Sequence, residues 1–334
     1  MTISWHDVDH QAQERLASCE HILGAISVGV AGADLDLNHP TLLVDMDVLA
    51  ADESASSLIT QLRTNLPVTQ LNLPFEDGIF KVAHTAEHAF GVLEINAQLD
   101  IQTASHHAYQ ALLACFKDLG KPRLLRLWNY MPHINALENG EERYRLFNTG
   151  RREALVEANY LAKDGAPAAC ALGSHRGTCK IAFLAATKPC TPIENPRQIS
   201  AYNYPKDYGF NPPIFSRAGL FAQEGGKDIL FVSGTASIVG HQSLHVGDIA
   251  LQTHETITNI QAVLQEANRL ADSSTNGNAW ILKNLHGQVY VRNPADIGII
   301  QDILKKHELV NFTYVHADIC RAELLVEIEA YAQL

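Results

Sequence analysis

Hydrophobic positions along the chain follow two spacings, one typical of strands and the other of helices. In the first half, segments rich in β-branched and aliphatic residues and separated by Gly, Asp, Asn and Pro predict strands at 23–30, 41–48, 68–73, 89–97 and 122–130. Apolar residues from Tyr109 to Leu119 recur at helical spacing, so we predict a helix that begins near Ser105 and stops at Gly120. Residues 1–22 are expected to be a polar lead-in with a short helix around 11–19.

The second half repeats this plan. A helix with its apolar stripe from Ile257 to Leu270 precedes a predicted strand at 279–292, and Gln252-Thr253 matches Gln102-Thr103 at an offset of 150 residues. Chance similarity is the alternative to a repeat. We predict an α+β fold of two halves, 1–150 and 151–334, each a mixed β-sheet with helices packed on one face. Residues 141–165 are predicted to be a mainly helical linker between them.

Composition and charge narrow the class of protein. With 334 residues, 46% of them hydrophobic, the chain can bury a substantial core. Its formal net charge of -12 disfavours nucleic acid and anionic lipid as partners. The start is too polar for a signal peptide and no long apolar run occurs, so we expect a cytoplasmic protein outside the membrane. The six cysteines form no C-x-x-C pair, which argues against a zinc knuckle and a disulfide framework.

The last strand carries the first candidate for chemistry. From Leu324 to Ala330 every second residue is apolar, which predicts a half-buried strand. Glu327 lies on the other face with Leu325, Glu329 and Tyr331, where partial burial can keep a proton on its carboxyl group near neutral pH. Cys320 stands seven residues earlier. Taken alone, a solvated glutamate and a small core cysteine are the alternatives.

Arginines and tyrosines accompany this acid. Several arginines cluster in 141–165, where a solvated basic helix face is the alternative to a binding role. Residues 168–221 are predicted to form a long ordered loop, and such loops are usually functional. Arginine binds carboxylates through paired hydrogen bonds and tyrosine fixes the remaining oxygens, so the pattern favours a small substrate with more than one carboxylate. Acid catalysis is then assigned to Glu327.

Other kinds of site find little support in the sequence. His241 and His245 are spaced like a ligand pair but stand between glycines, and no H-E-x-x-H pattern occurs. Residues 29–34 follow a predicted strand without the full G-x-G-x-x-G or the Walker lysine, and no G-x-S-x-G elbow is present. We therefore predict no metal, no nucleotide and no serine triad.

Several motifs carry a resemblance to a known family. GTASIVGHQS at 234–243 and the strand ending in VEIEAYA at 326–332 resemble the RidA/YjgF-like superfamily of trimeric enamine/imine deaminases, and LWNYMPHIN, ERYRLFNTGRREA, LGSHRGT, AYNYPKDYG and PPIFSRAG resemble the chorismatases, a two-domain branch of it. The resemblance covers roughly residues 120–334 and implies two RidA-like (chorismate-mutase-like) halves, the first degenerate. Phe312 stands where the deaminases carry a substrate-binding arginine, so ordinary deamination is not expected.

The resemblance implies a set of site residues in a pocket between the halves. Glu327 is the general acid, and Cys320 stands where aromatising chorismatases carry a cysteine and hydrolytic ones a small apolar residue. The backbone N–H groups from Gly234 to Ala236 are candidates for holding a carboxylate, with a tight turn as the alternative. The candidates for binding the substrate dianion are Arg151, Arg217, Tyr202 and Tyr208, with Arg145, Arg176 and Tyr204 as further ones.

The implied reaction is conversion of chorismate to 3-hydroxybenzoate and pyruvate, with or without 4-hydroxybenzoate, and without a cofactor. A hydrolytic chorismatase that forms a cyclohexadiene diol, a deaminase and a non-catalytic binder of aromatic acids are the alternatives. Single-domain relatives are trimers, whereas two halves in one chain can satisfy part of that interface internally, so both a trimer and a monomer are open.

Overall fold

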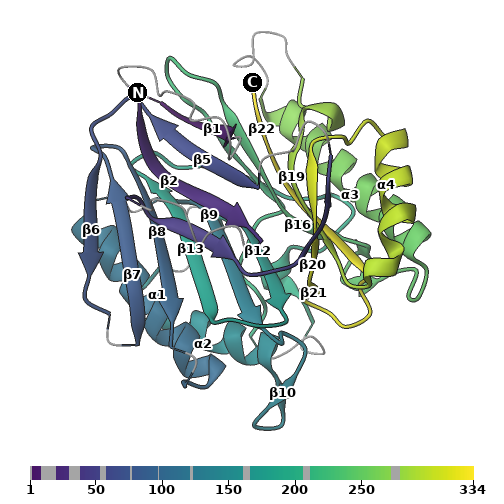
Figure 1. Ribbon diagram of the computed structural model, residues 1–334, viewed down its shortest axis with the longest axis horizontal. Helices are drawn as coiled ribbons and strands as arrows, with labels where there is room; N and C mark the ends of the chain where they lie inside the picture. The colour runs from purple at the N-terminus through teal and green to yellow at the C-terminus, as the bar shows by residue number, and fades with distance from the viewer. Residues whose placement is uncertain are drawn as a thin grey trace.

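The computed structural model describes residues 2–8, 20–29, 38–52, 58–75, 77–96, 98–120, 123–160, 166–205, 211–271 and 279–334. Two large sheets, each with helices on one face, flank a smaller sheet formed near the N-terminus (Figure 1). The smaller sheet has the strand order β1-β5-β2-β3, with β1 (Ile3–Val8), β2 (His21–Val28), β3 (Thr41–Val44) and β5 (Ile59–Thr64). Residues 2–8 are thus a strand rather than a lead-in, and the helix predicted around 11–19 falls outside the described residues.

The first large sheet has the order β6-β7-β8-β13-β9-β12-β21. Helices α1 (Ile101–Asp118) and α2 (Arg143–Glu157) belong to this half, and α1 begins where the Asp100 side chain accepts a hydrogen bond from Thr103 N. The two helices approach closely at Gly150, where an added Cβ would lie 2.0 Å from the Gln102 carbonyl oxygen. The strands are β6 (Thr69–Leu73), β7 (Gly78–His84), β8 (His88–Ile95), β9 (Arg123–Pro132), β12 (Ala168–Ser174), β13 (Cys179–Ala186) and β21 (Asp318–Ile319).

The second large sheet has the order β14-β15-β16-β22-β19-β20-β4. Helices α3 (Ile249–Leu270) and α4 (Ile297–Lys306) belong to it, and Asp248 caps α3 as Asp100 caps α1. Among the described residues, no helix is both long and apolar enough to cross a membrane. The strands are β4 (Val48–Ala51), β14 (Thr191–Ile193), β15 (Ala218–Phe221), β16 (Ile229–Ala236), β19 (His286–Val291), β20 (Phe312–His316) and β22 (Val326–Gln333).

The two large sheets share one topology. If the six main strands of each half are numbered along the chain, both sheets have the spatial order 1-2-3-6-4-5, and in each the fourth and fifth strands are parallel. A seventh strand, β21 or β4, completes each sheet from elsewhere in the chain. The predicted α+β fold with two similar sheet-and-helix halves is therefore confirmed.

The boundary between the halves differs from the predicted one. Residue 150 lies inside α2, and β12 and β13 still belong to the first sheet, which ends at Ala186 before β14 begins at Thr191. Residues 141–165 therefore contain the second helix of the first half rather than a linker. The predicted long loop at 168–221 contains four strands, because its glycine- and proline-rich stretches connect short strands whose apolar residues are buried in the sheets.

The central core explains the position of β22. Apolar side chains of all three sheets meet there, while separate cores lie between each large sheet and its helices. Val326, Ile328 and Ala330 share the face that packs toward the helices, whereas Leu324, predicted on that face, belongs to the central core. On the opposite face, Glu327 and Glu329 are only 4% and 3% exposed. The expectation of a half-buried strand is wrong, because the first sheet covers the face that alternation marks as polar. Two carboxyl groups are thereby buried between the halves.

Candidate active site

A cavity of about 320 Å³ lies where the two halves meet. The first half contributes the beginning of α2, and the second half contributes β16, β22 and the connection that precedes β22. A further wall contains Gln198, Tyr204, Pro213, Phe215 and Arg217. The polar and reactive side chains of the lining are Glu142, Tyr144, Arg145, Gln198, Tyr204, Arg217, Thr235, Cys320, Arg321, Glu323 and Glu327.

Glu327 reaches the cavity from the beginning of β22. Burial, followed by the neighbouring charge of Glu329, raises its pKa to about 8, while Arg126 acts in the opposite direction. Gly234 makes room for the carboxyl group, since an added Cβ there would lie 2.0 Å from Glu327 Oε1. Gly234 sits where the pairing of β16 with β22 is interrupted between Val232 and Thr235. Burial therefore favours the protonated form of Glu327 near neutral pH, in line with the sequence-based expectation.

Cys320 lines the same cavity, in the connection between β21 and β22. Burial, and next the nearby Glu327, raises the pKa of its thiol far above the usual range. The thiol is therefore protonated at neutral pH. A neutral thiol beside a neutral carboxyl group can shape a pocket and donate a weak hydrogen bond, but it is a poor nucleophile.

Positively charged arginine side chains line the same cavity as Glu327. Arg217 is 5% exposed, and its Nη2 donates to Tyr204 Oη and Ile199 O, both at 2.8 Å. The centroid of the Tyr204 ring is 5.6 Å from the guanidinium carbon of Arg217 and 5.3 Å from that of Arg321. Arg321 Nη1 donates to His241 O at 2.8 Å. Sequence reasoning missed Arg321, although its position next to Cys320 was an available signal.

Arg145 also lines the cavity, between acidic neighbours. Its guanidinium nitrogens lie 3.5 Å from Glu141 and 3.6 Å from Glu142. Burial raises the pKa of Glu142, which also lines the cavity. The cavity thus holds three arginines and three carboxyl groups. Among the three, Glu327 is the one whose pKa is raised to about 8.

Not all predicted binding residues reach the cavity. Arg151 is buried in α2 against the rings of Tyr109 and Phe147 and does not line the cavity. Tyr202 is 43% exposed and also lies outside the lining. Tyr208 falls outside the described residues.

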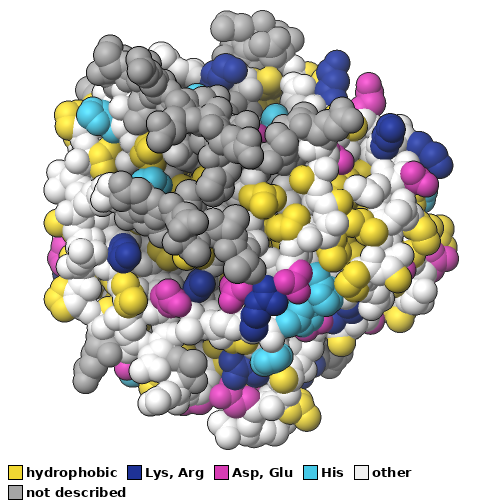
Figure 2. All heavy atoms as spheres, in the orientation of Figure 1, with side chains coloured by type: hydrophobic (Ala, Val, Ile, Leu, Met, Phe, Trp, Pro, Cys, Tyr) yellow, Lys and Arg dark blue, Asp and Glu magenta, His cyan; other side chains and the backbone are white. Residues whose placement is uncertain are grey.

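Arg176 lies at the surface turn after β12, where it pairs with Asp45 Oδ1 at 2.9 Å and Asp47 Oδ1 at 2.7 Å. Figure 2 shows acidic, basic and histidine side chains gathered below the centre of this face, near the ends of β12 and β20 in Figure 1. Arg176 thus pairs with acidic surface residues, and it is not among the residues that line the cavity.

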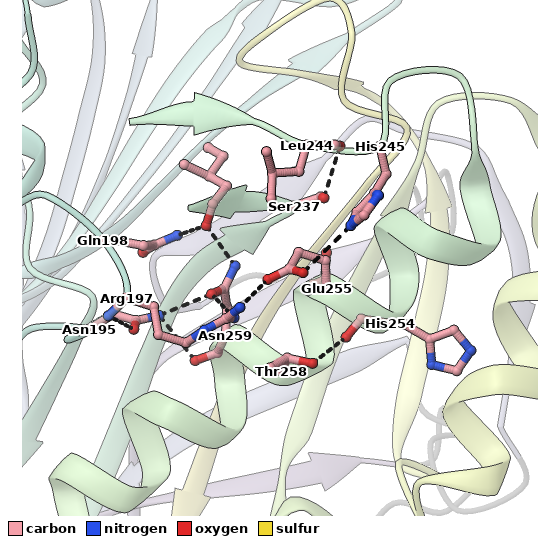
Figure 3. Close-up of polar contacts among 12 residues, drawn as sticks. Asn195, Arg197, Gln198, Ser237, Leu244, His245, His254, Glu255, Thr258 and Asn259 are labelled. Carbon is pink, nitrogen blue, oxygen red and sulfur yellow. Dashed lines mark hydrogen bonds and ion pairs between the residues drawn. The ribbon is translucent and has the colours of Figure 1, made fainter. Parts of the chain in front are cut away.

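A polar cluster supports one wall of the cavity from behind (Figure 3). Asn259 of α3 donates from Nδ2 to the carbonyl oxygens of Ala236 at 3.0 Å and Ile238 at 2.9 Å. Arg197 binds Asn259 Oδ1 and Glu255 Oε1, each at 2.6 Å. His245 lies 3.6 Å from Glu255, so one member of the spaced histidine pair belongs to this cluster. Ala236 is paired with Glu327 across the strands, and the cluster therefore fixes the wall beside the acid.

Comparison with known proteins agrees with this arrangement. The family model described as "Chorismatase FkbO/Hyg5-like, N-terminal" matches residues 69–185, which are the strands and helices from β6 to β13. A 3-hydroxybenzoate synthase from Streptomyces hygroscopicus is 33% identical over 304 residues, covering 88% of this chain and 86% of the relative. A chorismatase from Streptomyces rapamycinicus is 36% identical over 252 residues, covering 74% of this chain and 75% of the relative.

A solved structure extends the match to the whole fold. The crystal structure of a chorismatase superposes with a TM-score of 0.81 at 28% identity, covering 99% of this chain and 98% of that chain. Together with the sequence relatives, this match identifies the family: the chain belongs to the chorismatases.

Proposed function

We propose that this chain converts chorismate to 3-hydroxybenzoate and pyruvate without a cofactor. The names of its relatives, 3-hydroxybenzoate synthase and chorismatase, support this substrate and product. The observation that carries the proposal is the buried Glu327, whose pKa of about 8 leaves an acid available at neutral pH in a cavity that also holds arginines.

The first step is protonation of carbon. Glu327 donates its proton to the terminal methylene carbon of the enolpyruvyl group, which forms an oxocarbenium ion. Because Glu327 is 4% exposed and faces the cavity, the proton is held away from bulk water until substrate is present. General acid catalysis of this kind contributes about a hundredfold to ten-thousandfold in rate.

The second step makes the ring aromatic. The 4-hydroxyl oxygen forms a bond to C3 while the C3–O bond to the activated side chain breaks, so pyruvate leaves and the hydroxyl proton is released. The resulting arene oxide opens at C4 and loses the C3 proton to give 3-hydroxybenzoate. The two products contain all atoms of chorismate and no water is consumed, whereas formation of a diol would require one water. Cys320, with its neutral thiol, is placed to favour the first outcome by its shape rather than by covalent attack.

The substrate carboxylates require cations. Arg217 and Arg321, both near the Tyr204 ring, are the first candidates for binding them, with Arg145 as a further one. We assign this role to Arg321 instead of Arg151, Tyr202 and Arg176, because these three do not line the cavity.

Purified protein incubated with chorismate alone tests the proposal. We expect equal amounts of pyruvate and hydroxybenzoate by chromatography and NMR, and loss of at least a hundredfold in rate for Glu327→Gln. Cys320→Ala is expected to retain consumption of chorismate but to form some diol. Diol from the unchanged protein would contradict the aromatising route, and no turnover at all would contradict the function. Location in the cytoplasm is a further part of this proposal.

A further inference from the structure

Two carboxyl groups are buried side by side on one face of β22. Glu327 and Glu329 are two residues apart on a strand, a separation of roughly 7 Å, and both are less than 5% exposed. Two such groups cannot both carry a charge in a buried environment without a counter-ion, so one of them must be neutral or paired.

Only one of the two has a cation in contact. Arg126 of β9 crosses from the first half and binds Glu329, with Nη2 to Oε2 at 2.8 Å and both side chains at most 4% exposed. Within the described part of the chain, Glu327 makes no ion pair and instead faces the cavity.

Arg126 also holds the backbone next to the acid. Its Nη1 donates to Val232 O at 3.1 Å, directly before the interruption in β16 that includes Gly234. Gly234 is the residue that leaves space for the Glu327 carboxyl group. One side chain from the first half therefore contacts both features of the second half that shape the surroundings of Glu327.

We infer that Arg126 decides which of the two buried carboxyl groups is ionised. By pairing with Glu329 it keeps that group charged, and the charged neighbour keeps the proton on Glu327. Arg126 and Glu329 are thus positioning residues for the acid. This inference rests on the proposed role of Glu327 in the reaction.

The other titratable groups around the pair are neutral. They are Tyr130 of β9, Cys170 of β12, Tyr144 of α2, Tyr290 of β19 and Cys320, and burial raises the pKa of each far above its usual range. Arg321, Glu142 and Glu323 also line the cavity and act electrostatically on Cys320. The charges that act directly on Glu327 are those of Glu329, which raises its pKa, and Arg126, which lowers it.

The test is a titration of Glu327 in the free protein. Protein labelled with 13C at the glutamate side-chain carboxyl carbon is followed by NMR from pH 5 to 10, and Glu327→Gln identifies the signal. Glu329→Gln is expected to move the midpoint of Glu327 down by on the order of one pH unit, because it removes the anion and leaves Arg126. Arg126→Gln is expected to raise the pH at which the second of the two carboxyl groups loses its proton, because the two groups then share one proton without a neighbouring cation.

The double variant Arg126→Gln/Glu329→Gln is expected to return the midpoint close to that of the unchanged protein, since both opposing charges are gone and burial remains. Tyr290→Phe is the matched control. Tyr290 stands opposite Glu327 in the pairing of β19 with β22, and the change removes a hydrogen bond to Tyr130 without altering charge, so the midpoint should stay in place. Opposite shifts in the two single variants, reversed in the double variant, support the inference.

Glu329→Gln leaves a buried, unpaired arginine and can fail to fold. In that case Arg126→Gln and the double variant carry the test, and an unchanged midpoint in Arg126→Gln overturns the inference. The pH dependence of chorismate turnover is measured in the same variants. Midpoints that move as expected without any turnover would overturn the proposed function alone, whereas turnover with fixed midpoints would overturn this inference alone.

Discussion

Glu327 owes its chemistry to burial more than to any single neighbour. Desolvation is the largest cause of its raised pKa, and the charge of Glu329 comes second. Desolvation in turn depends on the first sheet, which covers a strand face that carries two glutamates. A residue that would be an ordinary surface glutamate in an isolated hairpin is thereby an acid at neutral pH.

Activity should therefore fall as the pH rises through the pKa of Glu327. We expect turnover to be constant below about pH 8 and to fall about tenfold per pH unit above it, because the pKa of Glu327 is about 8 and its acid form is required. Initial rates of pyruvate release from pH 6 to 10 measure this. A rate that rises through pH 8 would contradict the assignment of Glu327 as the acid.

The same group should destabilise the folded protein at alkaline pH. The folded state holds this proton between its ordinary pKa of 4.5 and about 8, whereas the unfolded chain does not. Folded protein thus binds more protons across that window, and its stability falls as pH rises through it. Glu327→Gln should remove this contribution, so it should gain more unfolding free energy relative to the unchanged protein at pH 8.5 than at pH 5.5. Urea unfolding at the two pH values provides the comparison.

Gly234 offers a steric test at the same scale. Gly234→Ala should lower turnover by tenfold or more without loss of fold, because the new methyl group would displace the Glu327 carboxyl group. Gly298→Ala is the matched control, since an added Cβ at that helix position meets no atom within 4 Å. We expect this control to keep full activity and to change stability by about 1 kcal/mol or less. Equal effects of the two changes would contradict the role given to Gly234.

At the scale of elements, the site depends on segments that meet only in the folded chain. The cavity is lined by residues at the beginning of α2, in the connection before β22 and in β16. The wall formed by Ala236 and Ile238 is held by Asn259 of α3. None of these elements contains a complete site.

Arg217, which lines the cavity, is expected to affect the binding of chorismate. Arg217→Gln should raise the KM for chorismate by roughly tenfold to a hundredfold, as expected for loss of about 1.5 to 3 kcal/mol from a charged hydrogen bond. Arg176→Gln is the matched control, because its partners are Asp45 and Asp47 outside the cavity. Steady-state kinetics of the two variants decide the point, and a similar rise of KM in the control would place a substrate carboxylate elsewhere.

At the scale of the molecule, one chain supplies both halves and encloses a shared core between them. Each large sheet has helices on one face and the shared central core on the other, and the small N-terminal sheet closes that core (Figure 1). We therefore expect a monomer. Size-exclusion chromatography with light scattering should give the mass of one chain, and a threefold mass would instead support the trimeric alternative.

Local sequence patterns predicted much of the framework. The periodicity of α1, α3, β9 and β22 was read correctly, and the repeat of Gln102-Thr103 at Gln252-Thr253 pointed to two halves of one topology. Short strands such as β1 and β5 were missed, because segments of this length carry few apolar positions. The helix α4 was missed although Ile300, Ile303 and Leu304 recur at helical spacing and are buried. The boundary was placed about 40 residues early for a related reason: β12 and β13 are recognised as members of the first sheet only by their pairing.

By itself the sequence determined which residues share a face of each strand and helix, and therefore that Glu327 and Glu329 lie together opposite the apolar face of β22. It also contained the motifs that mark the family. Only the tertiary structure decided that this face is covered, that Arg321 rather than Arg151 reaches the cavity, and that Arg126 pairs with Glu329 across 203 residues of chain. The physical reason is that periodicity encodes local geometry, whereas desolvation and ion pairing depend on which distant surfaces come into contact.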